Sequence, residues 1–263
     1  MPGPTDNFPV TEKTLRRDLM TLGVAPGRTL VAHSSLSAIG QVEGGPATVI
    51  CALLHALGEG GTLAMPAATP RCAEPAGWVE PPVPEPRLEE MRRKLLVFDL
   101  RATPTTLGAI PEEFRTWPGT LRSDHPLESV CARGPLAPEI IAEHPLAFSE
   151  GPGTPFGKLY ELDSWVLLLG VGFNRCTALH TAESMVENRR TVESRFPMME
   201  DGQRVWLKVL NVADDNDRHF PVIGERYLAQ DAARKGNIGE APSTLFPMRN
   251  LVDFARRYFE TTL

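Results

Sequence analysis

Apolar residues recur along the chain at two spacings, which predict alternating helices and strands. Leu15, Leu19 and Leu22 recur at helical spacing and predict a helix over residues 11–22. Uninterrupted apolar runs at 29–32, 62–65 and 165–172 predict buried strands, the last being the strongest strand signal. Further helices are expected at residues 45–57, 88–96, 106–115, 139–143, 222–235 and 251–258. This alternation is typical of an α/β protein with a parallel or mixed sheet covered by helices.

Two segments depart from the alternation. Proline is frequent between Pro66 and Pro86, so this stretch forms neither a regular helix nor a central strand. With the helix at 88–96 it is expected to form a flap over about residues 66–100, because long loops in compact domains often act as lids. Segments 191–198 and 204–212 predict a hairpin around the tight turn Asp201–Gly202. We expect one domain, residues 1–263, that includes the flap.

Composition narrows the function classes. With 42% hydrophobic residues in 263, the chain can bury a large core, and no apolar stretch reaches the roughly 20 residues that span a bilayer. The first ten residues lack the features of a signal peptide, so the cytoplasm is the expected location. A net charge of −6 disfavours nucleic-acid binding and suits a cationic small molecule. The four cysteines show no CxxC spacing, which indicates neither a disulfide framework nor a zinc knuckle.

The stretch Thr177–Glu183, TALHTAE, follows the strongest strand signal and opens a helix. His180 and Glu183 are three residues apart, so they lie on one helix face and the carboxylate can orient and charge-stabilise the imidazole. The pair would sit beyond the carboxyl end of a buried strand, where α/β sheets collect ligands. These features favour a general base, although a solvated helical pair has the same spacing.

Three turns rich in hydroxyl side chains are candidate anion sites. The first is His33–Ser37 with Gly40 behind it, and the others are 103–108 and 121–126. Small hydroxyls and backbone amides before a helix suit a phosphate or pyrophosphate. The turns match neither a Walker loop nor a GxGxxG fingerprint, and ordinary capping and turn chemistry is the alternative for each.

Two other kinds of active site are disfavoured. A zinc site could draw ligands from His33, His125, His180 and Glu183, but their separations match no compact ligand spacing and HEXXH is absent. A serine hydrolase could use Ser34 or Ser35 beside His33, but the chain has no GxSxG elbow. No metal is therefore expected.

Several of these segments together carry a resemblance to a known family. The segments VAHSSLSAIG, LRSDHP and TALHTAE, in this order and spacing, closely resemble the aminoglycoside 3-N-acetyltransferase family, from about residue 11 to the final LVDFARRYF. The resemblance implies a three-layer α/β/α sandwich around a mixed, mostly parallel sheet. It also implies acetyl-CoA as co-substrate and the 3-amino group of the 2-deoxystreptamine ring of an aminoglycoside as acceptor. A monomer or homodimer is expected.

The resemblance also implies roles for individual residues. His180 would be the general base in a direct attack within a ternary complex, and Glu183 would orient it. Ser35 or Thr177 is a candidate donor to the thioester oxygen. Coenzyme A would be held by residues of the hydroxyl-rich turns, namely His33, Ser34, Ser35, Leu36, Ser37, Thr103, Thr105, Gly108, Arg122, Ser123 and His125.

The acceptor of this family is polycationic, so an acidic cleft is expected. The candidate contacts lie in the flap and in the acidic stretch near residue 215, and they are Glu74, Trp78, Asp214, Asp215, Asp217 and Glu225. Two alternatives remain open. One is an N-acyltransferase of the same fold that acts on another amine metabolite, and the other is a catalytically weak coenzyme A-binding relative.

Overall fold

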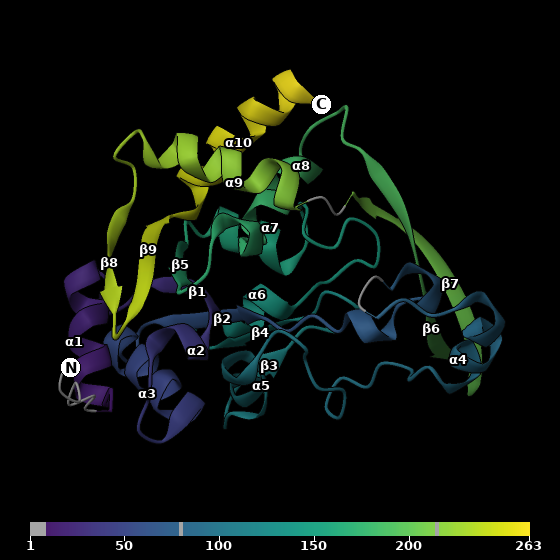
Figure 1. Cartoon of the computed structure of the whole chain (residues 1–263), viewed down its shortest axis with the longest axis horizontal. Coiled ribbons are helices and arrows are strands. Elements are labelled where there is room, and N and C mark those ends of the chain that lie inside the picture. Colours follow the sequence, from purple (N-terminus) through teal and green to yellow (C-terminus); the bar gives the residue numbers. More distant parts are fainter. Residues whose placement is uncertain (1–8, 79–80, 214–215) are drawn as a thin grey trace, which may run out of the picture.

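A seven-stranded sheet forms the centre of the computed structural model, which describes residues 9–78, 81–213 and 216–263 (Figure 1). Within these residues the strand order is β3-β4-β2-β1-β5-β9-β8. The strands are β1 (Thr29–Ser34), β2 (Thr62–Pro66), β3 (Leu121–Arg122), β4 (Val130–Arg133), β5 (Trp165–Leu169), β8 (Arg234–Ile238) and β9 (Ala241–Pro247).

The sheet is mixed, as expected for this α/β class. Strand β1 pairs in parallel with β2 and with β5, whereas the β2–β4, β3–β4, β5–β9 and β8–β9 pairs are antiparallel. The expectation of a mostly parallel sheet therefore holds only for the three central strands. Their common direction matters for function, because β1 and β5 end at the same edge of the sheet.

Helices cover both faces of the sheet and complete the three layers. On one face lie α1 (Glu12–Leu22), α2 (Leu36–Ile39), α3 (Gly45–Leu57) and α5 (Ala109–Thr116), which share a core with the inward side chains of β1, β2 and β5. The other face is covered by α6 (Ala137–Ile141), α7 (Pro155–Glu161), α8 (Ala178–Ser184), α9 (Asn216–Leu228) and α10 (Met248–Thr262). Alternation along the strands divides their side chains between these two cores.

Local signals explain several element boundaries. Thr11 caps α1 in a reciprocal capping box with Thr14, and Gly23 ends the helix with a φ of 113°. Gly170, directly after β5, has a φ of 67°, and a Cβ there would lie 2.5 Å from the Cβ of Ala38. Glycine therefore allows the chain to leave β5 in close contact with α2.

The predicted hairpin is confirmed as a separate two-stranded sheet beside the main one (Figure 1). Strands β6 (Thr191–Glu200) and β7 (Gln203–Val212) pair in register around Asp201 and Gly202, whose φ values of 49° and 75° are those of a type I′ turn. The proline-rich segment packs against this hairpin. Arg204 donates to the carbonyls of Arg92 and Arg93, at the end of α4 (Leu88–Lys94).

Apart from Pro66, which ends β2, the described residues of the proline-rich segment form short 3₁₀ helices and no strand, in line with their composition. These helices are η1 (Pro70–Cys72), η2 (Pro75–Gly77) and η3 (Glu85–Arg87), followed by α4. A further 3₁₀ turn, η4 (Phe173–Arg175), lies between β5 and α8. No helix in the described part of the chain is long and apolar enough to cross a membrane.

The largest error of the sequence prediction concerns residues 216–247. The helix expected at 222–235 instead begins at Asn216, continues through Pro221 and ends at Leu228, and the chain then forms β8 and β9. Strand β8 is an exposed edge strand of sequence RKGNI, which carries no apolar alternation. The short elements β3, β4 and α7 were also missed, and α6 begins two residues before the expected start.

Candidate active site

The turn between β5 and α8 places TALHTAE at the carboxyl edge of the sheet. Strand β5 ends at Leu169, and α8 begins at Ala178, with η4 between them. Helix α8 is buried over most of its length, because Ala178, Leu179 and Ala182 pack into the core on this face. The predicted helical placement of His180 and Glu183 is therefore correct.

His180 and Glu183 contact each other directly. The Nδ1 atom of His180 lies 3.3 Å from Oε2 of Glu183, whose side chain is only 1% exposed. The His180 side chain is 12% exposed, so solvent or a ligand can reach it. If Nδ1 carries the proton and donates to the carboxylate, Nε2 is the ring atom that can accept a proton, which is the arrangement of an oriented general base.

Two residues near this pair carried no recognisable sequence signal. Phe220 of α9 packs edge-on against the imidazole of His180, with ring centroids 4.8 Å apart. Arg190, just before β6, places Nη2 3.9 Å from Oε1 of Glu183. Phe220 and Arg190 are each more than five residues away from this pair along the chain, so only the fold brings them close to α8.

The His33–Ser37 segment lies at the same edge of the sheet. His33 and Ser34 are the last residues of β1 rather than loop residues, and they pair with Leu168 and Leu169 of β5. His33 is 7% exposed, its Nε2 has no hydrogen-bond partner, and burial lowers its pKa to about 4. The hydroxyl of Ser34 is also buried without a partner.

The following residues form the short helix α2, which starts at Leu36. The hydroxyls of Ser35 and Ser37 lie 3.1 Å apart at its start, and Ser37 is exposed. Hydroxyls in this position can donate to an anionic or carbonyl ligand. The β1–α2 junction therefore offers polar groups at the carboxyl end of β1, and their role in binding coenzyme A stays a prediction.

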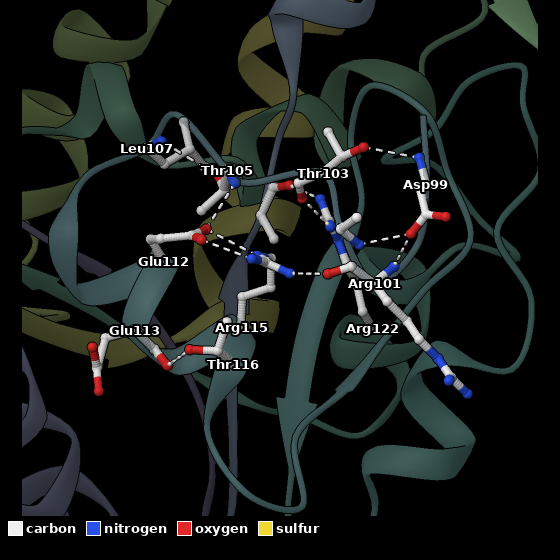
Figure 2. A network of polar contacts seen from close by, with 12 residues as sticks. Asp99, Arg101, Thr103, Thr105, Leu107, Glu112, Glu113, Arg115, Thr116 and Arg122 are labelled. Atoms are coloured by element: carbon white, nitrogen blue, oxygen red, sulfur yellow. Dashed lines mark hydrogen bonds and ion pairs between the residues drawn. The ribbon is translucent and has the colours of Figure 1, made fainter. Parts of the chain in front are cut away.

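Arg122 is a structural residue in this fold. Its guanidinium is buried and donates to the hydroxyl of Ser129 and to the carbonyls of Ala67 and Leu100. It also donates to the carbonyl of Thr103 (Figure 2). Burial lowers its pKa. The arginine therefore ties the start of the proline-rich segment to residues 100–103, and four of its five N–H donors bond within the protein.

The predicted binding residues of the 103–108 turn have internal partners as well. The Thr103 hydroxyl accepts from the backbone amide of Asp99, and the Thr105 hydroxyl donates to the carbonyl of Ala68 (Figure 2). Gly108 has a φ of 118° and precedes α5. The capping and turn chemistry considered from the sequence accounts for these contacts.

Ser123 and His125 also lie inside the protein. The Ser123 hydroxyl accepts from the amide of Val130 and contacts Nδ1 of His144 at 2.8 Å. His125 stacks on His144 with ring centroids 4.5 Å apart. Desolvation by burial lowers the pKa of His125 to about 4 and that of His144 to about 3, so both imidazoles are neutral at pH 7. No sequence pattern had indicated His144.

Comparison with known proteins decides the family. The family model for aminoglycoside 3-N-acetyltransferases matches residues 31–260. The chain belongs to the aminoglycoside 3-N-acetyltransferase family. The expected enzyme class, an N3-acetyltransferase, is thereby confirmed.

Individual relatives of this acetyltransferase agree in sequence and in structure. It is 37% identical to the SPbeta prophage-derived aminoglycoside N(3')-acetyltransferase-like protein YokD of Bacillus subtilis, over 96% of this chain and 93% of YokD. The crystal structure of YokD matches with a TM-score of 0.92 at 36% identity, over 97% and 95% of the two chains. The structure described as AAC-IIIb binary with CoASH matches at 0.82 with 31% identity, over 96% and 97%. AAC-VIa bound to sisomicin matches at 0.85 with 30% identity, over 97% and 98%.

The residues expected at the acceptor cleft of the acetyltransferase, namely Trp78 and five acids, differ in their surroundings. Glu74 is half-buried and pairs with Arg92 at 2.8 Å and with Arg195 at 3.8 Å, so its charge is compensated within the protein. Trp78 donates to the carbonyl of Ala73, and Glu225 is exposed on α9. Two of the remaining predicted acids, Asp214 and Asp215, lie outside the described residues. For Asp217 the structure describes only the backbone, which belongs to α9.

The described residues of the acetyltransferase contain no group of three His, Cys, Asp or Glu side chains arranged to hold a metal ion. The four cysteines are free, and burial raises the pKa of the Cys131 and Cys176 thiols to about 12. Neither thiol is therefore ionised at neutral pH.

Proposed function

We propose that this acetyltransferase transfers the acetyl group of acetyl-CoA to the 3-amino group of an aminoglycoside, with His180 as general base. The observation that carries the proposal is the contact between Nδ1 of His180 and the buried carboxylate of Glu183, at the carboxyl edge of the central strands. A carboxylate in this position orients the imidazole and stabilises its protonated form.

The chemistry assigned to His180 is removal of a proton from the acceptor amine. A neutral amine attacks the thioester carbonyl, the C–S bond breaks, and the leaving thiolate takes up a proton. His180 takes the amine proton at Nε2 and can return it to the thiolate, so no acyl-enzyme is required. General-base catalysis of this kind contributes about 10²–10⁴-fold.

Polar groups for the acetyl donor are available beside α8. The partnerless hydroxyl of Ser34 and the hydroxyls of Ser35 and Ser37 suit a carbonyl or phosphate acceptor. They fit the coenzyme A group that AAC-IIIb binds in its binary structure. The hydroxyl of Ser35 is our candidate donor to the oxygen that becomes negative in the transition state.

The acceptor is proposed from the family and from charge. AAC-VIa has been solved with the aminoglycoside sisomicin, and the net charge of −6 on this chain attracts a polycation. Glu225, exposed on α9, is the described acidic residue proposed to face it, and α9 also carries Phe220 against His180. The segment at 66–100 is proposed as a lid. A cytoplasmic location and a monomeric or homodimeric state stay predictions.

The test measures thiol release from acetyl-CoA with a panel of aminoglycosides. The variant His180→Gln should lower kcat by about 10²–10⁴-fold while acetyl-CoA still binds. His55→Gln is the matched control, because His55 is a half-exposed histidine of α3 that pairs with Glu12, on the opposite face of the sheet. Wild-type turnover in His180→Gln would refute the mechanism. Coenzyme A binding without turnover of any aminoglycoside would refute the proposed acceptor.

A further inference from the structure

The two carboxylate oxygens of Glu183 have different surroundings. Oε2 faces Nδ1 of His180 at 3.3 Å, whereas Oε1 has no hydrogen bond and lies 3.9 Å from Nη2 of Arg190. The latter distance is that of an ion pair without a hydrogen bond. Because the Glu183 side chain is 1% exposed, solvent does little to stabilise its charge. Arg190 is therefore the cation that the structure places on the Oε1 side of this buried carboxylate.

Arg190 occupies a junction of the chain. It directly precedes β6, and its carbonyl accepts from the amide of Ala213, which directly follows β7. Both strands of the hairpin therefore return to the body of the protein at this residue. The side chain of the same residue reaches toward Glu183.

The neighbouring arginine has a different role. Arg189 donates to the carbonyl of Val186 and stacks over the ring of Phe148, with its guanidinium carbon 4.5 Å from the ring centroid. It thus closes the turn after α8 and holds the loop around residue 148. Two consecutive arginines, one directed to Glu183 and one to Phe148, provide a matched pair for mutagenesis.

We propose that Arg190 is a positioning residue for acetyl transfer, which holds the carboxylate of Glu183 in the orientation that faces His180 and links this pair to the base of the β6–β7 hairpin. The inference rests on the proposed role of His180 as general base. It adds Arg190 to His180 and Glu183 as a third residue of the site. It also provides a route by which movement of the β6–β7 hairpin alters proton removal by His180.

Steady-state kinetics on the full chain test the inference. Arg190→Gln should lower kcat about 10- to 100-fold, because a small misplacement of a catalytic base has an effect of this size, and should leave KM for acetyl-CoA unchanged. Arg190→Lys retains the charge and should recover much of the lost kcat. Arg189→Gln should keep kcat near the wild-type value. A thermal melt of each variant shows that it is folded.

A double-mutant cycle separates this inference from the proposed function. If Arg190 acts through Glu183, then Arg190→Gln should have little further effect on kcat in a Glu183→Gln background. Additive losses, or a folded Arg190→Gln variant with wild-type kcat, would overturn the role of Arg190. If either of these results is found while His180→Gln loses activity, the proposed function still holds. Wild-type activity in His180→Gln would instead remove the base itself.

Discussion

Two groups of polar residues beside the main sheet differ in their hydrogen bonding. The Arg122 cluster consists of Arg122 and its neighbours Thr103, Thr105, Glu112 and Arg115, and the His180 pair consists of His180 and Glu183. Arg122 donates to four protein oxygens, and beside it Glu112 accepts from Arg115 and from the amide of Thr105 (Figure 2). The guanidinium of Arg115 lowers the pKa of Glu112. Around His180, in contrast, one oxygen of Glu183 makes no hydrogen bond, and the imidazole is partly accessible.

This difference separates a cluster that stabilises the fold from one that can bind and react. A polar cluster whose hydrogen bonds are all made within the protein has no capacity left for a ligand. A cluster with an accessible base and an incompletely bonded carboxylate retains that capacity, at some cost in stability. The following three predictions test the contrast.

Replacing Arg122 should cause the largest loss of stability. Arg122→Met leaves the carbonyl of Thr103 without its donor and removes one of the two donors to the carbonyl of Ala67, so we expect the free energy of unfolding to fall by about 3 kcal/mol. Urea denaturation measures the change. Arg101→Met, at an exposed neighbouring position, should change it by less than about 0.5 kcal/mol. Equal effects of the two variants would remove the distinction between the clusters.

The buried histidines should make stability depend on pH. The pKa of His125 is about 4 in the folded protein, below the value of about 6.5 for an unfolded chain, so the unfolded state binds more protons between these pH values. The free energy of unfolding is therefore highest above pH 6.5, and it falls by about 2 kcal/mol as the pH is lowered to 4. Urea unfolding at several pH values should show this decline.

A matched pair of variants assigns that decline. His125→Asn, which retains an acceptor for the amides of Leu127 and Glu128, should give a shallower pH dependence than the wild type. His55→Gln, at an exposed histidine of α3, is the control for replacing a histidine as such. An identical slope in the wild type and His125→Asn would contradict the assignment.

The smallest expected effect comes from a single hydroxyl of the Arg122 cluster. Thr105→Val removes one of the two donors to the carbonyl of Ala68, the other being the amide of Thr106, and should reduce the free energy of unfolding by about 1 kcal/mol, without changing kcat. Thr106→Val, at the exposed neighbouring position, should have no measurable effect on stability. A loss of kcat in Thr105→Val with unchanged stability would instead favour a direct role of Thr105 in binding the donor.

Sequence reasoning succeeded where the evidence was local. Helical spacing placed His180 beside Glu183, and an Asp-Gly pair located the hairpin turn, because neighbours along the chain determine both. The central strands were found from continuous apolar runs. Strand β8 was missed because an exposed edge strand needs no apolar alternation, and its pairing with β9 depends on contacts that the local sequence does not encode.

Roles that depend on burial could not be predicted in the same way. Arg122 lies in the 121–126 turn together with Ser123 and His125, and an arginine there suits a phosphate. Its acceptors at Ala67 and Thr103 are 55 and 19 residues away along the chain. The same applies to His144, which gains its importance only by stacking on His125.

The hairpin and the proline-rich segment share a small core of their own. Cys72, Leu127 and Phe196 form a buried cluster separate from the two large cores that flank the main sheet. Substitutions there therefore act mainly on local packing, while the sheet that presents His180 keeps its own support. Over evolutionary time the two segments can diversify together, so new variants can arise in them without loss of the scaffold.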